Sequence, residues 1–129
     1  MLAGCDLPSF QGVALPGADR PATAASGPAT AGTLERLGDH TLASGDLPTT
    51  IALYRRAHEA APDEPEVLRK LGAVLGRVGA YDESAGAYRA ALRIEPGDAE
   101  ALRGLGNAEI ALGRPAEALP WLEAALASG

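Results

Sequence analysis

The 129-residue sequence has few aromatic residues and few residues that favour strands. Phe, Trp and Tyr together make up 4% of it, so alanine and leucine have to supply the apolar core. Both residue types lose little conformational freedom in a helix. Val, Ile and Thr are scarce and never alternate with polar residues over a useful length, which argues against a sheet. The composition therefore predicts an all-α protein.

Positive charge and long apolar runs are also lacking. The chain has 11 Lys and Arg against 17 Asp and Glu, which gives a formal net charge of −6. A basic surface for nucleic acid is therefore not expected. No run of about 18 apolar residues occurs, so no segment is expected to span a bilayer. Lys70 is the only lysine, and the abundance of Arg, Ala and Gly is typical of a GC-rich bacterial genome.

Motifs of catalytic and metal sites are missing as well. The only histidines, His40 and His58, have no metal-ligand spacing to other side chains, and both are expected on helix surfaces. The sequence contains no G-x-S-x-G, no phosphate-binding glycine loop and no H-E-x-x-H. We therefore expect a protein without enzymatic activity, bound metal or cofactor.

What the sequence does contain is a repeat of 34 residues that begins after residue 30. Leucine recurs at two places in each unit, glycine at two and alanine at one. The recurring residues are Leu34, Leu68, Leu102, Leu37, Leu71, Leu105, Gly38, Gly72, Gly106, Gly45, Gly79, Gly113, Ala57, Ala91 and Ala125. A fixed period of this length indicates a repeat architecture. We assign a repeat domain to residues 31–129, with repeats at 31–64, 65–98 and 99–129.

Each repeat is expected to fold as two helices around a glycine turn. In the second repeat, Asp63 is the expected N-cap of the first helix, and Gly79 ends that helix in a left-handed conformation. Residues 81–94 then form the second helix. Asp46 and Asp98 are the expected caps of a helix in the first and third repeats.

Glycine recurs inside the first helix of every repeat, where it costs roughly 1 kcal/mol relative to alanine. Three such costs at one repeat position, at Gly38, Gly72 and Gly106, predict that the paired helix approaches closely there. The expected small partners on the second helices are Ala57, Ala91 and Ala125.

This pattern resembles the tetratricopeptide repeat, which has a 34-residue period and the signature W-x2-L-G-x2-Y…A-x3-F…P. The matching segments are LERLGDHT from residue 34, LRKLGAVL from residue 68 and LRGLGNAE from residue 102. Leucine replaces the tryptophan of the signature in all three. The resemblance covers residues 31–129 and implies an α-solenoid, a right-handed superhelix of helical hairpins that binds proteins.

The resemblance also implies a concave groove, lined by the first helices, for a peptide or protein segment. By analogy the groove residues are Glu35, Asp39, Arg69, Ala73, Arg77, Arg103 and Asn107. Such a groove is acidic at the first repeat and basic at the second and third, which favours an extended segment with an acidic end. The alternative is that these are solvated charges without a partner. One subclass of the family binds chaperone C-terminal carboxylates through basic and asparagine residues, but Glu35 and Asp39 occupy those places here.

Residues 1–30 differ from the repeats in composition. Leu2-Ala3-Gly4-Cys5 resembles the bacterial lipoprotein box, in which the cysteine is acylated. The rest of the segment is rich in Pro, Gly, Ala, Ser and Thr, which predicts a flexible linker. This interpretation places the protein on the periplasmic face of a bacterial membrane, held by lipid on Cys5. It requires the basic and apolar parts of a signal peptide to precede Leu2. The alternative is a cytoplasmic protein in which Cys5 is incidental.

The layout of lipobox, linker and repeats resembles the tight-adherence (Flp) pilus assembly lipoproteins of the TadD type. Pilotins and outer-membrane assembly lipoproteins share that layout. We therefore expect a membrane-anchored scaffold for a pilus or secretion complex. The alternatives are a soluble cytoplasmic adaptor and a regulatory fragment of a larger protein. An apolar edge expected at Trp121, Leu122 and Leu126 predicts self-association, a partner or a longer chain.

Overall fold

The computed structural model describes residues 28–128, and all regular structure in this range is α-helical. The helices are α2 (Pro28–Ser44), α3 (Leu47–Ala60), α4 (Pro65–Arg77), α5 (Tyr81–Ile94), α6 (Ala99–Ala111) and α7 (Pro115–Ser128). The predicted all-α fold is confirmed. Helix α2 begins three residues before the predicted start of the repeat domain. Cys5 and the predicted linker, apart from its last three residues, lie outside the described residues.

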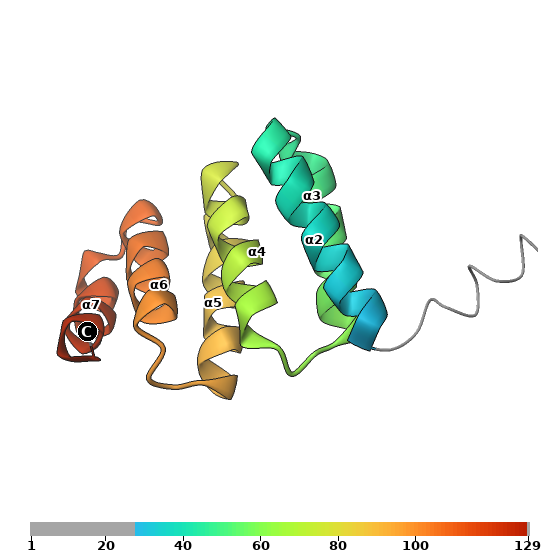
Figure 1. Ribbon diagram of the computed structural model, residues 1–129. Coiled ribbons are helices and arrows are strands. Elements are labelled where there is room, and N and C mark those ends of the chain that lie inside the picture. Colours follow the sequence, from blue (N-terminus) through green and yellow to red (C-terminus); the bar gives the residue numbers. More distant parts are fainter. Residues whose placement is uncertain (1–27, 129) are drawn as a thin grey trace, which may run out of the picture.

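The helices form three antiparallel hairpins that stand in a row, α2–α3, then α4–α5, then α6–α7 (Figure 1). Contacts are densest within each hairpin and continue between α3 and α4 and between α5 and α6. A glycine with positive φ follows the first helix of every hairpin: Gly45 at +88°, Gly79 at +85° and Gly113 at +80°. The left-handed end predicted at Gly79 is confirmed, and the other two turns repeat it.

The core lies between successive hairpins in two clusters. The first cluster joins Tyr54 and Ala57 of α3 to Leu71 and Val74 of α4. The second joins α5 to α6, with Tyr88 and Leu105 among its members. A hairpin of this size cannot bury its apolar face alone, so each repeat is stabilised by the next one in the row.

Close packing at the helical glycines is confirmed, but the predicted partners are wrong. A Cβ atom added at Gly38 would lie 2.5 Å from Cε1 of Tyr54. The equivalent contacts join Gly72 to the Tyr88 ring and Gly106 to Leu122. The large side chain that precedes each alanine by three residues fills the space above the glycine. The alanines instead pack elsewhere in the buried interior, as Ala57 does in the first cluster.

The helix caps agree with the sequence prediction at two of three places. The Asp46 side chain accepts a hydrogen bond from the Thr49 N–H, and Asp98 accepts from Glu100 and Ala101. Asp63 was expected to cap α4, but Glu64 holds the cap position and makes no side-chain cap bond. Pro65 is the first residue of α4 and has no N–H to satisfy, which reduces the need for a cap there.

Histidine placement differs in part from the prediction. His40 is exposed on α2, as expected, whereas His58 on α3 is half-buried. The Nδ1 atom of His58 is buried and has no hydrogen-bond partner among the described residues. His58 therefore lies on a helix, as expected, but is less exposed than His40.

Candidate peptide-binding groove

The seven predicted groove residues lie on the first helices of the three hairpins. Glu35 and Asp39 belong to α2, and Arg103 and Asn107 belong to α6. The three predicted on α4 are Arg69, Ala73 and Arg77. Within each helix the residues are four apart, a spacing that places their side chains on one face. Two adjoining pockets lie between α4 and α6 on this side.

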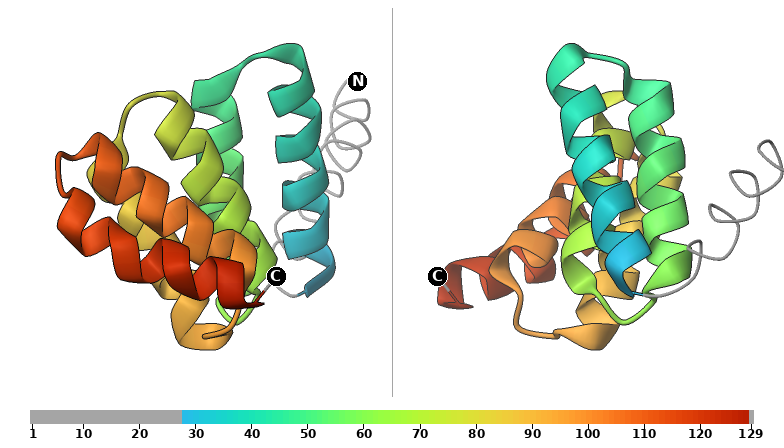
Figure 2. Two further views of the ribbon diagram at one scale, coloured as in Figure 1. Left: turned by 90° about the vertical axis from the view of Figure 1, so that its left-hand side faces the viewer. Right: turned by 45° about the vertical axis from the view of Figure 1, so that its right-hand side comes forward.

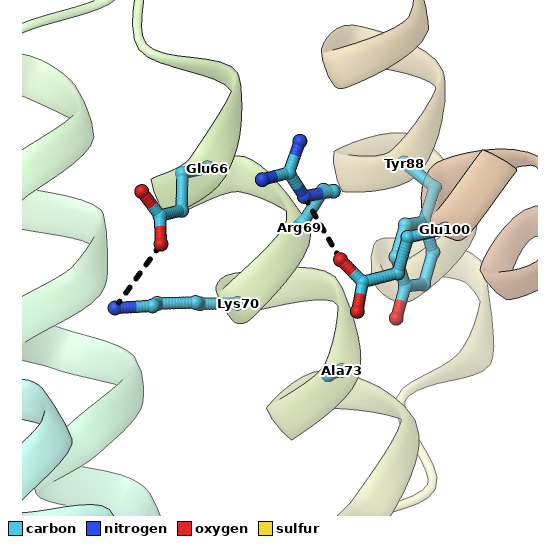
Figure 3. A pocket seen from close by; sticks show the side chains of 6 residues that line it. All are labelled: Glu66, Arg69, Lys70, Ala73, Tyr88 and Glu100. Atoms are coloured by element: carbon cyan, nitrogen blue, oxygen red, sulfur yellow. Dashed lines mark ion pairs between the residues drawn. The ribbon is translucent and has the colours of Figure 1, made fainter. Parts of the chain in front are cut away.

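The first pocket, which we call the Arg69 pocket, has a volume of about 250 Å³. Its lining residues are Glu66, Arg69, Lys70, Ala73, Tyr88 and Glu100. Figure 3 shows Arg69 and Lys70 on the same helix pointing apart, Arg69 toward Glu100 and Lys70 away from it. The two cations of this pocket therefore reach different partners.

The second pocket, which we call the Arg77 pocket, has a volume of about 330 Å³. Its lining residues are Gly72, Ala73, Gly76, Arg77, Tyr81, Ser84, Tyr88, Gly104, Asn107 and Ala108. Ala73 and Tyr88 line both pockets, so the two adjoin. Glycine and alanine form much of the lining. The Tyr88 ring fills the space over Gly72 and Gly104, so the room for a small side chain lies over Ala73 and Gly76. Arg103 lines neither pocket.

Lys70 neutralises the acidic part of the groove on α2. Its Nζ lies 2.7 Å from Oε2 of Glu35 and 3.0 Å from Oδ2 of Asp39. The Tyr54 hydroxyl donates a hydrogen bond of 2.5 Å to Oδ1 of Asp39. The sequence prediction omitted Lys70. A signal was available, because Lys70 follows Glu35 by 35 residues and Asp39 by 31, close to one repeat length.

The same contacts shift the pKa values of the groups involved. Partial burial alone would raise the pKa of Asp39, but hydrogen bonds from Tyr54 and Lys70 outweigh it and hold that pKa below its ordinary value. Burial and the adjacent Asp39 carboxylate raise the pKa of Tyr54. Burial opposes the charged form of Lys70, yet Glu35 and Asp39 raise its pKa above the ordinary value. Asp39 is therefore ionised and Lys70 protonated at neutral pH, so the pair that they form is held by opposite charges.

Arg69 is also neutralised by acids of the described chain. Its guanidinium forms ion pairs with Asp98 and with Glu100, the latter at 3.2 Å, and lies 3.5 Å from Glu95. Burial opposes the charged form of Arg69, but Asp98, Glu100 and Glu66 outweigh it and hold the pKa of Arg69 above its ordinary value. Of the predicted groove cations, Arg69 is therefore paired within the chain, and the positive charge predicted for the second and third repeats is left to Arg77 and Arg103.

The cations that remain available are Arg77 and Arg103. Both side chains are exposed, and neither forms a hydrogen bond or an ion pair with any residue of the described range 28–128. Asn107 is likewise exposed and unpaired within that range. The Arg77 pocket therefore offers one free guanidinium and one free amide on the same side of the molecule.

Tyr88 was not among the predicted site residues, although it lies between the two pockets. Its ring packs so closely on α6 that a Cβ atom added at Gly104 would lie 2.3 Å from Cζ. Burial and the nearby Glu100 raise the pKa of Tyr88, and Arg103 opposes this only in part. The spacing Ser84-x3-Tyr88 repeats Thr50-x3-Tyr54 of the first repeat and predicts a core position. It gives no sign that Tyr88 also lines the groove pockets.

Within the described part of the chain, no group of three or more His, Cys, Asp or Glu side chains is arranged to hold a metal ion. None of the helices from α2 to α7 combines the length and apolar character that crossing a membrane requires.

Residues 69–129 match the family model described as tetratricopeptide repeat. Together with the row of helical hairpins, this match shows that the described segment has the fold of a tetratricopeptide-like solenoid. No curated protein sequence matches the chain.

Solved structures share the fold. One crystal structure of MamA has 26% identity and a TM-score of 0.73, covering 76% of this chain and 57% of its own. The chain thus spans little more than half the length of that protein. The first TPR of Spaghetti (RPAP3), solved with the HSP90 peptide SRMEEVD, has 19% identity and a TM-score of 0.77. It covers 80% of this chain and 82% of its own. At that identity the likeness shows the fold alone.

Proposed function

We propose that this protein is an interaction scaffold that holds an extended peptide segment along α2, α4 and α6. The observation that carries the proposal is the Arg77 pocket. It combines a small-residue lining with the free side chains of Arg77 and Asn107. A tetratricopeptide fold is consistent with a protein-binding scaffold, and the Spaghetti domain of the same fold is solved with a peptide.

The unpaired charges specify the kind of segment. Lys70 and Arg69 are occupied by acids of this chain, so neither has full charge to offer a ligand. Arg77 is free, and an exposed guanidinium next to a carboxamide suits a carboxylate. We therefore expect an acidic side chain of the segment to bind at Arg77 and Asn107, with small or apolar residues over the glycine-rich lining.

Peptide binding tests this proposal with three probes. Fluorescein-labelled SRMEEVD supplies an acidic end, SRMQQVN removes its acidic side chains, and amidated SRMEEVD removes only the terminal carboxylate. We expect anisotropy to show that SRMEEVD and its amide bind alike and that SRMQQVN binds at least fivefold more weakly. Equal binding of all three would contradict the proposed acidic preference.

Variants of the protein locate the binding. Arg77→Glu should weaken SRMEEVD at least fivefold and abolish the preference over SRMQQVN. Arg56→Glu is the matched control, because Arg56 on α3 is an exposed arginine outside both pockets. If Arg56→Glu weakens binding as much as Arg77→Glu, the effect is one of net charge and the groove is not the site.

We further propose that lipid on Cys5 anchors the scaffold to a bacterial membrane, where it aids assembly of a pilus or secretion complex. The support is the Leu2–Cys5 box followed by a Pro- and Gly-rich stretch and then repeats, a layout resembling lipoproteins of the TadD type. Membrane fractionation after expression behind an export signal tests the anchor. The unaltered protein should be in the membrane fraction and Cys5→Ser in the soluble one. If both are soluble, the anchor is refuted and a soluble adaptor is favoured.

A further inference from the structure

The last hairpin exposes three large apolar side chains. Ile110 of α6 is 49% exposed, and Leu119 and Leu126 of α7 are 56% and 83% exposed. Trp121 and Leu122, which the sequence predicted at this edge, are half-buried: Trp121 packs against the second core cluster and Leu122 covers Gly106. The left view of Figure 2 faces this end of the row, with α6 and α7 nearest the viewer.

The repeat register identifies what these exposed positions do elsewhere in the chain. Leu119 corresponds to Ile51, which packs against the first core cluster, and Leu126 corresponds to Leu92, which packs against the second. Ile110 corresponds to Leu42, which also packs against the first cluster. Each of the three positions therefore has an equivalent in one earlier repeat that packs against a core cluster shared by two successive hairpins.

Arg103, the unpaired arginine of the third repeat, can be compared with its equivalent in the second repeat in the same way. Arg103 lies 34 residues after Arg69. Arg69 is 21% exposed and is paired with Asp98 and Glu100, at the start of the helix that packs on the second repeat. Arg103 is exposed and has no such partner among the described residues. Arg103 therefore lacks the kind of partner that Arg69 has, which is the acidic first turn of a helix packed on its repeat.

We propose that the surface formed by Arg103, Ile110, Leu119 and Leu126, the C-terminal face, docks an amphipathic helix of a partner protein whose first turn is acidic. Continuity with the internal packing supports the apolar stripe, and charge complementarity to Arg103 supports the acidic start. A second copy of this chain fits less well. Its exposed first helix, α2, has no acidic residue in its first turn, whereas α4 and α6 have Glu66 and Glu100.

The chain supplies its own probe, because α6 is the helix that packs on the equivalent face of the second repeat. The probe is a labelled peptide of residues 95–112. A matched peptide with Asp98→Asn and Glu100→Gln removes the acids while Asn still caps the helix. Binding will be weak, since an isolated helix of this length is marginal in water. We expect the protein to bind the acidic peptide about three- to tenfold more tightly than the neutral one.

Three variants of the protein complete the test. Arg103→Glu should abolish the preference for the acidic peptide, and Leu126→Asp should weaken both peptides about tenfold. Leu126 is almost fully exposed, so weaker peptide binding by the Leu126→Asp variant cannot come from a damaged core. Circular dichroism of the variant checks that its helices are intact. Arg77→Glu should leave peptide 95–112 unaffected, which separates this face from the groove.

Two results would overturn the proposal. One is equal affinity of the protein for the acidic and neutral peptides, or a preference that survives Arg103→Glu. The other is self-association of the protein in sedimentation velocity that Leu126→Asp abolishes, because the face would then be an interface between copies.

Discussion

At the scale of single residues, neighbours decide whether an arginine can bind a partner. Arg69 and Arg103 occupy the same repeat position, yet Arg69 is paired with Asp98 and Glu100 at the start of α6, and Arg103 has no such partner among the described residues. A paired arginine that is mostly buried contributes to packing between repeats, and reversing its charge would disturb that packing. For this reason Arg77 is the better probe of the groove than Arg69.

Gly38 provides a direct test of close packing at a residue. Alanine at this position would gain roughly 1 kcal/mol in helix propensity, but its Cβ would lie 2.5 Å from the ring of the fully buried Tyr54. We expect Gly38→Ala to lower the free energy of unfolding by about 1–3 kcal/mol, as measured by urea unfolding.

Gly86 on α5 is the control for Gly38, because nothing lies within 4 Å of a Cβ added there. Gly86→Ala should leave stability unchanged or raise it by up to about 1 kcal/mol. If the two alanine variants are equally stable, the Tyr54 ring yields without cost and close packing does not explain the glycine.

The Asp39 carboxyl makes stability depend on pH. Its pKa lies below the ordinary 3.8 in the folded chain, so it contributes stability above that value and loses it as the pH falls through the folded pKa. We expect the free energy of unfolding to fall below about pH 4, and to fall less steeply in Asp39→Asn. Urea unfolding at a series of pH values measures this. Identical slopes in the two proteins would contradict the role of Asp39.

At the scale of helices, Asp98 and Asp63 are both predicted as N-caps, but only Asp98 caps its helix. Asp98 accepts hydrogen bonds from Glu100 N at 3.1 Å and Ala101 N at 3.3 Å and pairs with Arg69. Asp63 makes no cap bond. Asp98→Ala should therefore lower the free energy of unfolding by about 1–2 kcal/mol, and Asp63→Ala by less than about 0.5 kcal/mol. Thermal and urea unfolding of the pair measure the difference, and equal losses would refute the assignment.

Helix positions could be predicted from the sequence, because the apolar period and the turn residues are local. Residues 81–94 form the expected helix α5, and Gly79 has the expected positive φ. Asp63 was misassigned because Pro65 sets the start of α4, and a cap one residue further back cannot reach its free N–H groups. A shift of one residue in the start of the helix therefore decides whether an aspartate side chain can reach the first-turn N–H groups.

At the scale of the whole molecule, the row of repeats could be predicted, whereas its charge pairing could be predicted only in part, from spacings close to one repeat such as that of Lys70 to Glu35. The 34-residue period fixes which helices are neighbours. The ion pairs that Lys70 and Arg69 make across repeats depend on where these long side chains extend. Figure 3 shows the Arg69–Glu100 pair and Lys70 extending in the other direction. The predicted groove residues lie on the expected helices, but the free charge is at Arg77 and Arg103.

The proposed peptide site along the first helices, over the Arg77 pocket, is tested most directly by a two-dimensional amide NMR spectrum of the labelled protein titrated with SRMEEVD. We expect the signals of Ala73, Arg77 and Asn107 to shift most, while those of Arg55 and Arg56 on α3 stay in place. Shifts that concentrate on α3 and α5, with the signals of the first helices unmoved, would contradict it.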